Sequence, residues 1–219
     1  MHLNNRRLST LEMKGRIHFR ENNSDLFYKV YKKDHLLDES GSIKNRIRQI
    51  HKLSRAMAFM PKTSFSYEGD FLVMQQKLLI RDKEFEQIDP SQRVPLIQQF
   101  ARSLDKLCQD RFIHGDINRK NIIYSGGRLC LIDLEPSLLQ VKDRVKQWMS
   151  TRPYRYSEDI NNNNITTKSD FLGFGCFVKW FLGSSHPPQF YATRCSEMIN
   201  QLEINSTPFQ TLVPLLVES

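Results

Sequence analysis

The stretch FIHGDINRKNIIYSGGRLCLIDLE, residues 112–135 of the 219-residue chain, combines polar turns with two apolar runs that are typical of strands. Within it, Asp116, Asn121 and Asp133 carry carboxylate or amide oxygens. Asp and Asn favour turns, so one interpretation is that all three are turn residues. Asp133, however, lies inside the apolar run LCLIDLE, where an uncompensated carboxylate is costly. We therefore predict a bound cation, and Mg²⁺ suits these hard oxygen ligands.

Length and composition describe an ordinary globular chain. A chain of 219 residues suits one large domain or two small lobes, and its 39% hydrophobic and 26% charged residues are normal values. The 32 Lys and Arg residues exceed the 24 Asp and Glu residues, which gives a net charge of +8. This excess favours anionic partners such as nucleotides, acidic proteins, nucleic acids or lipid head groups. Because basic and aromatic residues do not interleave as in RNA-binding proteins, we expect no nucleic-acid partner.

The cysteines and the N-terminus bear on the compartment. The four cysteines are widely spaced and form no C-x-x-C motif, so reduced core thiols are expected. The stretch MHLNNRRLST lacks the apolar core of a signal peptide, and no run reaches the ~18 apolar residues of a membrane span. We therefore expect a cytoplasmic protein without a transmembrane segment. Delivery of a bacterial protein into a host cell is compatible with the same features.

The first part of the chain predicts a small antiparallel sheet and one helix. Residues 11–33 alternate apolar and polar side chains around the turn-rich ENNSD, which is typical of a hairpin. The apolar run FLVM follows a turn at EGD. Apolar residues at helical spacing predict an amphipathic helix over 43–57. The outer face of this helix is basic and is a candidate binding site for a partner protein; it carries Lys44, Arg48, Lys52 and Arg55.

The second part of the chain is mainly helical. After a loosely patterned stretch at 80–92, helical spacing of apolar residues predicts one helix over 94–107 and another over 170–182. We therefore place a domain boundary between residues 1–80 and 81–219. The expected fold class is α+β, in which a small antiparallel sheet with one helix precedes a reduced, mostly helical lobe.

The opening stretch resembles the protein-kinase superfamily. The catalytic loop H-R-D-x-x-x-x-N and the metal-binding D-F-G of that family correspond to HGDINRKN and DLE here. The segment STRPYRYSED, at 150–159, is similar to the kinase stretch that ends in A-P-E, and KSDFLGFGCFVKWFLG, at 168–183, to the S-D-x-x-x-x-G helix that follows it. The resemblance covers residues 10–190 and implies a minimal two-lobed kinase fold, with lipopolysaccharide-kinase-like features in the catalytic loop.

This resemblance implies an ATP site in the first lobe. Lys29, in FYKVYKK, corresponds to the lysine that holds the α and β phosphates. Met74, in FLVMQQKL, corresponds to the residue at the back of the adenine pocket, and Gln75 and Lys77 fall on the hinge that follows. ATP is therefore the expected cosubstrate.

In the second lobe, the resemblance implies phosphoryl transfer to a hydroxyl group. Asp116 would orient the acceptor hydroxyl and take its proton, and Lys120 would steady the γ-phosphate. Asn121 and Asp133 would bind Mg²⁺.

The same resemblance implies two structural roles in this lobe. Asp170 would anchor the backbone of the catalytic loop near His114. Glu158 would pair with a basic residue late in the chain, for which Arg194 is the candidate.

Three departures from the family pattern change these expectations. The glycine-rich phosphate loop is absent, with only Gly15 in the corresponding hairpin, so low nucleotide affinity is expected. The 43–57 helix has no Glu to pair with the nucleotide lysine, although Glu39 lies just before it. Gly115 replaces the arginine that reads loop phosphorylation, which predicts activity that does not depend on a phosphorylated loop.

Three functions follow from these observations. The first is a Ser/Thr or Tyr protein kinase, favoured by the segment through Glu158 and by the helix around Asp170, with an acidic substrate favoured by basic residues before that segment. The second is a kinase of a small-molecule or glycan acceptor, such as a lipopolysaccharide sugar, favoured by HGD and DLE. The third is a pseudokinase that only binds a partner, which the presence of Asp116, Asn121 and Asp133 disfavours.

Overall fold

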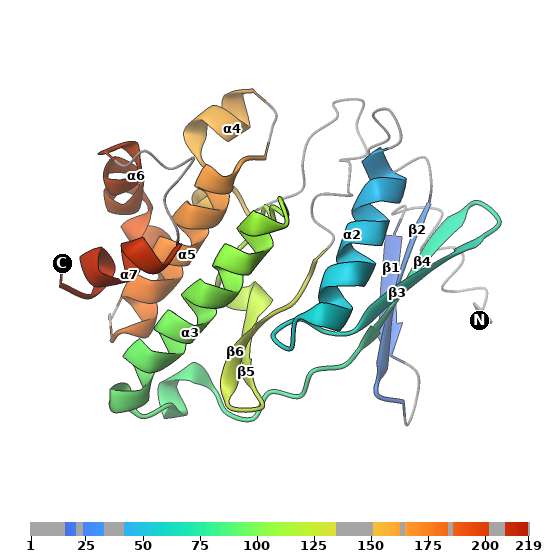
Figure 1. Cartoon of the computed structure of the whole chain (residues 1–219), viewed down its shortest axis with the longest axis horizontal. Helices are drawn as coiled ribbons and strands as arrows, with labels where there is room; N and C mark the ends of the chain where they lie inside the picture. The colour runs from blue at the N-terminus through green and yellow to red at the C-terminus, as the bar shows by residue number, and fades with distance from the viewer. Residues whose placement is uncertain are drawn as a thin grey trace. The chain divides into compact units, whose positions relative to one another are not determined.

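The computed structural model describes residues 16–20, 24–32, 42–134, 151–162, 165–183, 186–201 and 209–218. Contacts between residues divide the chain into two compact units, with a boundary between Leu79 and Ile80. The strands β1 to β4 and helix α2 belong to unit 1, and the remaining labelled elements of Figure 1 belong to unit 2.

Unit 1 contains a four-stranded antiparallel sheet. The strands lie in the order β1-β2-β4-β3, so that the two hairpins β1/β2 and β3/β4 join through their long middle strands. The predicted first hairpin corresponds to β1 and β2, in which Ile17 pairs with Val30. Gly69, at a φ of 58°, allows the tight turn of the second hairpin. The bounds are β1 Arg16–Arg20, β2 Leu26–Lys32, β3 Thr63–Glu68 and β4 Phe71–Lys77.

Helix α2 (Ser42–Ala56) packs against this sheet, as predicted from its periodicity. A short chain of hydrogen bonds joins the two: the Thr63 N–H donates to Ser54 Oγ at 3.2 Å, and Gln76 Nε2 donates to Thr63 Oγ1 at 3.2 Å. These polar groups are buried and partnered, so they orient the helix without an unsatisfied donor. The buried apolar residues of α2 are Ile43, Ile50 and Leu53.

The two faces of the sheet carry different residues, because side chains alternate along a strand. On one face Lys29 of β2 lies directly opposite Met74 of β4. Gln76, which connects to α2, is two residues from Met74 and therefore shares its face. The opposite face holds an apolar cluster of Ile17, Val30 and Val73.

Unit 2 consists of helices around one short hairpin. The hairpin pairs β5 (Ile122–Ser125) with β6 (Arg128–Leu131), and Gly126 and Gly127, at φ of 59° and 72°, form its two-residue turn. The helices are α3 Pro90–Gln109, α4 Ser157–Asn161, α5 Thr167–Phe181, α6 Ala192–Gln201 and α7 Phe209–Glu218, and the 3₁₀ turns are η2 Phe85–Gln87, η3 Arg119–Asn121, η5 Arg152–Tyr154 and η6 Pro188–Tyr191.

Helix α5 is the centre of unit 2. Its Phe174 and Phe177 are fully buried, and both lie within ring-contact distance of Phe100 on α3. Phe209, the first residue of α7, stacks on Phe171 of α5 with ring centroids 4.1 Å apart. Aromatic side chains supply large apolar area in specific geometries, so this cluster joins α3, α5 and α7 into one core.

A buried carboxylate also attaches α7 to α3. Asp105 of α3 accepts hydrogen bonds from the Phe209 N–H at 2.5 Å and from Gln210 Nε2 at 2.8 Å. The N-terminal N–H groups of a helix lack partners inside the helix and carry partial positive charge, so a carboxylate at this end is stabilising. Asp105 therefore caps α7 from a different helix.

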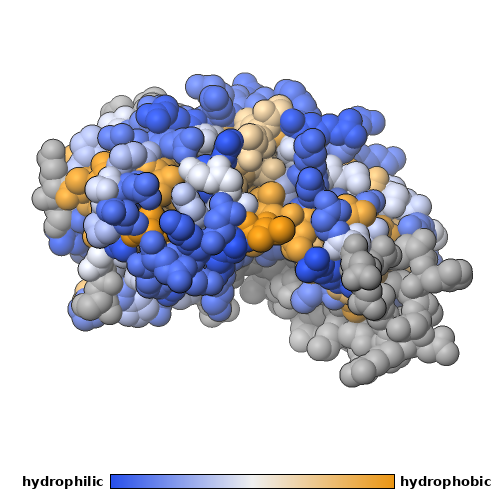
Figure 2. All heavy atoms as spheres, turned by 90° about the horizontal axis from the view of Figure 1, so that it is seen from below, coloured by the Kyte–Doolittle hydropathy of each residue, from blue (hydrophilic) through white to orange (hydrophobic). Residues whose placement is uncertain are grey.

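These elements confirm the expected α+β class, with a small antiparallel sheet and one helix in unit 1 and mostly helices in unit 2. The two strands and turn expected within 112–135 are residues 122–131, whereas residues 112–121 form a loop and the η3 turn. Within the described residues, no helix is long and apolar enough to span a membrane. Figure 2 shows a mostly hydrophilic face interrupted by a few patches of hydrophobic residues.

The cysteines are free thiols, and three of them are buried. Burial raises the pKa of the Cys130 thiol to about 11 and that of Cys108 to about 12. Both thiols are therefore protonated at neutral pH and behave as small core residues.

Replacing Asp105 tests the attachment of α7. We expect Asp105→Ala to lower the free energy of unfolding by about 2–3 kcal/mol, because the end of α7 loses its cap while the surrounding residues stay buried. Urea denaturation followed by circular dichroism measures the change. Asp70→Ala, at an exposed turn of unit 1, is the control and should have little effect. Equal losses for both variants would contradict the capping role.

Candidate active site

The loop at residues 112–121 is anchored by a carboxylate at the start of α5. Asp170 is buried, and its two oxygens accept hydrogen bonds from the backbone N–H groups of His114 and Gly115, each at 2.7 Å. Hydrogen bonds to an ionised acceptor are short and stronger than neutral ones, so the loop backbone is firmly held. The predicted anchoring role of Asp170 is confirmed.

Two glycines allow the loop and α5 to approach this closely. Gly115 has a φ of 82°, and a Cβ there would lie 2.9 Å from Ile165 Cδ1. This is why no arginine can occupy the position without a shift of the loop. A Cβ on Gly173 would lie 2.0 Å from the Ile117 carbonyl oxygen, so α5 contacts the loop through bare backbone.

His114 connects the loop to the end of β6. The Asp116 N–H donates to its Nδ1 at 3.2 Å, and its Nε2 lies 3.0 Å from the Ile132 carbonyl oxygen. Because Nδ1 accepts, the proton of the neutral ring must be on Nε2, which donates to that carbonyl. His114 is fully buried, so it acts as a structural bridge and has no access to a reacting group.

Asp116 and Asn121 are in direct contact in this loop. Asn121 Nδ2 donates to both the carbonyl oxygen and Oδ2 of Asp116, at 2.9 Å each. The other carboxylate oxygen, Oδ1, accepts from the Thr151 N–H at 2.8 Å. The Asp116 carboxylate is therefore held in one orientation, with lone pairs on both oxygens still available to an incoming hydroxyl.

Asn118 positions the loop through its side chain, and the sequence interpretation missed this residue. Its Nδ2 donates to the Asp116 carbonyl oxygen at 3.0 Å and to Thr151 Oγ1 at 3.4 Å, while its Oδ1 accepts from the Lys120 N–H at 2.9 Å. It is buried, so these bonds join the loop to the segment that begins at Thr151. The only sequence signal was an Asn two positions after Asp116.

Asp133 does not lie within a strand, which corrects the sequence expectation. Strand β6 ends at Leu131, and Asp133 follows it half-buried with a φ of 63°. The left-handed conformation is tolerated by Asp better than by most residues and recurs at functional sites. Ile132 lies between Leu131 and Asp133, and both of its backbone polar groups are bonded. Its N–H donates to the Asn121 carbonyl oxygen at 2.8 Å, and its carbonyl oxygen accepts from His114 Nε2.

The donor set fits Mg²⁺. The side-chain nitrogen of Asn121 bonds to Asp116, so the Oδ1 atom of Asn121 remains available as a hard oxygen ligand. The second ligand, the Asp133 carboxylate, directly follows Ile132, whose N–H donates to the Asn121 carbonyl oxygen. Mg²⁺ is commonly held by one or two such oxygens, with phosphates and waters as its other ligands. Asn121 and Asp133 are therefore the residues that would hold it.

Lys120 lies on the η3 turn with its side chain exposed. Within the part of the chain that the structure describes, its ammonium group forms no ion pair, so the predicted role at a γ-phosphate stays a prediction.

The candidate nucleotide residues of unit 1 lie on two faces of the sheet. Lys29 and Met74 are cross-strand neighbours on one face, Met74 is fully buried, and Lys29 Nζ lies 5.8 Å from the centre of the Phe27 ring. Gln75 and Lys77 alternate with Met74 and therefore point to the other face. Lys77 is exposed and its Nζ lies 3.8 Å from Asp25, while its backbone N–H donates to the Lys62 carbonyl oxygen at 2.8 Å.

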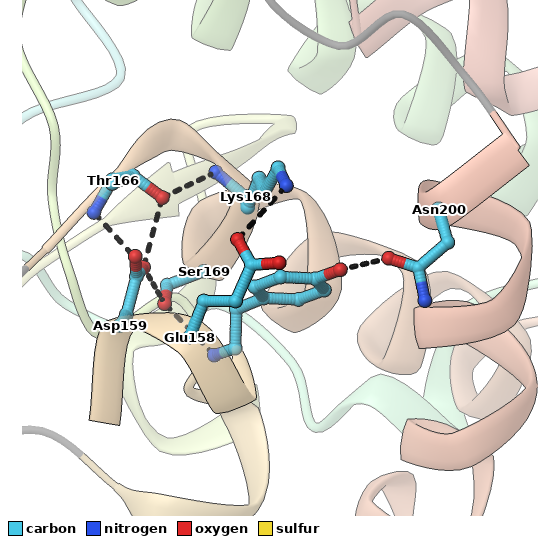
Figure 3. Close-up of polar contacts among 7 residues, drawn as sticks. Glu158, Asp159, Thr166, Lys168, Ser169 and Asn200 are labelled. Atoms are coloured by element: carbon cyan, nitrogen blue, oxygen red, sulfur yellow. Dashed lines mark hydrogen bonds and ion pairs between the residues drawn. The ribbon is translucent and has the colours of Figure 1, made fainter. Parts of the chain in front are cut away.

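The segment after Thr151 is attached to unit 2 by a buried polar network (Figure 3). Asp159 accepts from the N–H and Oγ1 of Thr166 at 2.9 Å each, and from Ser169 Oγ at 2.5 Å. Ser169 Oγ in turn accepts from the Tyr156 N–H at 2.9 Å, and the Tyr156 hydroxyl bonds to Asn200 on α6. Ser169 directly precedes Asp170, so this network and the loop anchor share one helix end.

This network corrects the expectation for Glu158. Glu158 is exposed and pairs with Lys168 at 3.2 Å, whereas Arg194 was the predicted partner. The buried carboxylate that holds the segment is Asp159, one residue later. Alternating buried and exposed positions in a short helix were not resolvable from the motif alone.

Tyr154 lies in the same segment, closer to the loop. Burial, with smaller contributions from Cys176 and Asp116, raises the pKa of its phenol. The neutral hydroxyl donates to Gln189 Oε1 of η6 at 3.2 Å. This bond extends the anchored segment towards η6.

Arg119 anchors the η3 turn at the end of the loop to α5 and η2, and the sequence interpretation missed this residue as well. Its guanidinium lies 4.0 Å from the centre of the Trp180 ring on α5, and its Nη2 lies 2.6 Å from Glu86 of η2. Both contacts hold the Arg119 side chain against η2 and α5. Arg119 therefore positions the η3 turn that carries Asn121.

A family model described as the phosphotransferase enzyme family (APH) matches residues 29–140, just over half of the chain. The chain belongs to this family, which is part of the protein-kinase-like superfamily. It is therefore a phosphotransfer enzyme. The matched range begins at Lys29 and includes Asp116, Asn121 and Asp133. No similar curated protein was found.

The close approach of α5 to the loop can be tested with two glycines of the same helix. We expect Gly173→Ala to lower the free energy of unfolding by about 2–3 kcal/mol, because its Cβ would overlap backbone. Gly175→Ala is the control: its Cβ would meet side chains and no backbone, with Cys195 Sγ at 3.1 Å and Leu216 Cδ2 at 3.8 Å, and Ala gains about 1 kcal/mol of helix propensity. Thermal and urea unfolding measure both. Equal destabilisation would show that the backbone contact is unimportant.

The anchoring role of Arg119 predicts a separation of effects. We expect Arg119→Ala to lower the free energy of unfolding by only about 1 kcal/mol, because the pair with Glu86 is partly exposed. The same variant should reduce kcat while changing the KM for nucleotide much less. Trp180→Leu should reproduce the loss. Arg102→Ala, at an exposed site on α3, serves as the control and should change neither constant. An effect on stability alone would assign Arg119 a purely structural role.

Proposed function

We propose that the protein is an ATP- and Mg²⁺-dependent kinase that transfers the γ-phosphate to a Ser, Thr or Tyr hydroxyl of a protein. The observation that carries the proposal is the orientation of the Asp116 carboxylate by Asn121 on one oxygen and by the Thr151 N–H on the other. One bond belongs to the metal-binding side of the site and the other to the segment that follows it. A carboxylate fixed in this way supports a role as the base that takes the proton of an acceptor hydroxyl.

The chemical step needs little more than position and charge neutralisation. Asp116 accepts a hydrogen bond from the acceptor hydroxyl and takes its proton. A new bond forms between the acceptor oxygen and the γ-phosphorus, and the bond from that phosphorus to the bridging oxygen breaks, which releases ADP. The two hydrogen bonds on the carboxylate limit its rotation, so that no reorientation is needed before proton transfer.

Asn121 and Asp133 would hold the metal through Oδ1 and a carboxylate oxygen. Bound Mg²⁺ would neutralise the phosphate oxygens of ATP as charge develops during transfer. The bond from the Ile132 N–H to the Asn121 carbonyl keeps these two ligands in register, because Ile132 directly precedes Asp133. Lys120, on the same turn as Asn121, is assigned to the γ-phosphate.

In the proposal, residues 1–80 form the nucleotide-binding lobe and 81–219 the catalytic lobe. Lys29 would hold the α and β phosphates, and Met74, its cross-strand neighbour, would line the adenine pocket. Gln75 and Lys77 would lie at the hinge that follows the adenine pocket, although their side chains point to the other face of the sheet.

A protein acceptor is favoured by the segment at 151–162. Its buried attachment through Asp159, and the bond from Tyr154 to Gln189, fix this segment beside Asp116, and we expect an extended peptide to bind along it. Because the Thr151 backbone already bonds to Asp116, and Gly115 supplies no arginine, activity should not require a phosphorylated loop. The +8 net charge favours an acidic substrate.

Transfer of radiolabelled γ-phosphate from Mg·ATP to a general protein acceptor tests this function. We expect Asp116→Asn to reduce the rate about a hundredfold or more, because the base is lost, and Asp133→Asn or EDTA to abolish transfer. Asp70→Asn, at an exposed turn, is the matched control and should retain activity.

The same assay separates the competing functions. Label on sugars or other small acceptors, but not on protein, would reject the protein acceptor and keep the phosphotransferase. Mg²⁺-dependent ATP binding without transfer to either class would favour a pseudokinase.

A further inference from the structure

Helix α2 carries charge of a single sign. Its sequence, SIKNRIRQIHKLSRA, contains five Lys or Arg residues and no Asp or Glu. Like charges four residues apart on a helix repel each other, so this composition weakens the helix unless an anion lies against it. Helix α2 alone contributes a large part of the +8 charge of the chain.

Four of these cations form one surface, which we call the basic face: Lys44, Arg48, Lys52 and Arg55. All four are exposed, and at 100° per residue they lie within an arc of about 80°. The opposite side of the helix is the buried stripe against the sheet. Among the described residues, Lys44, Arg48 and Arg55 have no ion-pair partner.

The basic face offers charge without apolar contact. None of the exposed large hydrophobic side chains of the described chain lies on α2. A helix that binds a membrane surface inserts an apolar face, but the apolar stripe of α2 is already buried in unit 1. Binding of single-stranded nucleic acid relies on aromatic side chains for stacking, and α2 contains no Phe, Tyr or Trp.

The spacing of the cations suits an extended acidic chain. Lys44, Arg48 and Lys52 follow one another at a rise of about 6 Å. In an extended peptide, side chains on one face repeat every second residue, at about 6.7 Å. A segment with Asp or Glu at alternate positions therefore places one carboxylate near each cation in turn.

We propose that the basic face of α2 is a docking site for an acidic segment of a partner protein. The site is in unit 1 and uses none of the residues assigned to phosphoryl transfer, so it stands independently of the proposed function. Its binding is mainly electrostatic and therefore weakens as salt rises.

A binding assay on the full chain without nucleotide tests the proposal. The probe is a fluorescent peptide of alternating Glu and Ser, followed by anisotropy at about 50 mM and about 150 mM salt. We expect Arg48→Glu/Lys52→Glu to weaken binding at least about tenfold. The matched control is Arg102→Glu/Lys106→Glu, an exposed pair with the same spacing on α3, which makes the same change in net charge and should weaken binding less than about twofold. Arg48→Gln/Lys52→Gln removes the two charges without reversing them and should give an intermediate loss of peptide affinity. It also serves as a control in case the charge-reversed variant does not fold.

Other outcomes would overturn the proposal. Equal weakening by the α2 and α3 variants would mean that only net charge attracts the peptide. Tighter binding of an oligonucleotide or of anionic vesicles, with the same dependence on Arg48 and Lys52, would assign the face to nucleic acid or lipid. Absence of peptide binding at the lower salt would make the basic face a solvated surface.

Discussion

The geometry of the active site depends on one buried carboxylate. Asp170 accepts two short hydrogen bonds from successive backbone N–H groups, those of His114 and Gly115. Because the bonds go to backbone, they determine the path of the loop whatever side chains it carries. His114, held by its own N–H, then orients the Asp116 N–H and the Ile132 carbonyl through its two ring nitrogens. The loop that carries Asp116 and the segment that carries Asp133 are thus both positioned from Asp170 on α5.

That arrangement requires space as well as charge. Gly173 lets the α5 backbone lie against the Ile117 carbonyl, and Gly115 lets the loop turn at a positive φ beside Ile165. The aromatic core behind α5 resists displacement, since close-packed interiors transmit strain. Arg119 adds a second attachment, so that the η3 turn is held from the Trp180 side as well. The site is therefore positioned by packing on the helical unit.

Much of this was accessible from sequence, and the reasons are physical. Helices α2 and α3 have apolar periodicity, α5 is apolar along most of its length, and Asp116 and Asn121 are close enough along the chain for a turn to bring them together. Asp133 was assigned to a strand because its neighbours are apolar, but β6 ends at Leu131, two residues before Asp133. Apolar residues occur in buried loops as well as in strands, so an apolar run alone does not show where a strand ends.

The remaining misses concern side-chain direction. Glu158 and Asp159 are adjacent carboxylates at the start of a one-turn helix, and which of them is buried depends on Thr166 and Ser169, several residues away. The roles of Asn118 and Arg119 likewise depend on partners in distant segments, Thr151 and Trp180. Contacts across long sequence separations leave no local pattern from which to predict them.

The cap on α7 has a consequence for the order in which the protein is made. Asp105 and its partner Phe209 are separated by 104 residues. At about 5–20 residues per second, ribosomal synthesis leaves roughly 5 to 20 s between the two. During that interval α3 is complete, but its buried carboxylate has no helix end to bond, and the aromatic surface that later stacks on Phe209 is uncovered. The core of unit 2 can thus close only after α7 has been synthesised, and until then the apolar surface that α7 covers stays open to other contacts.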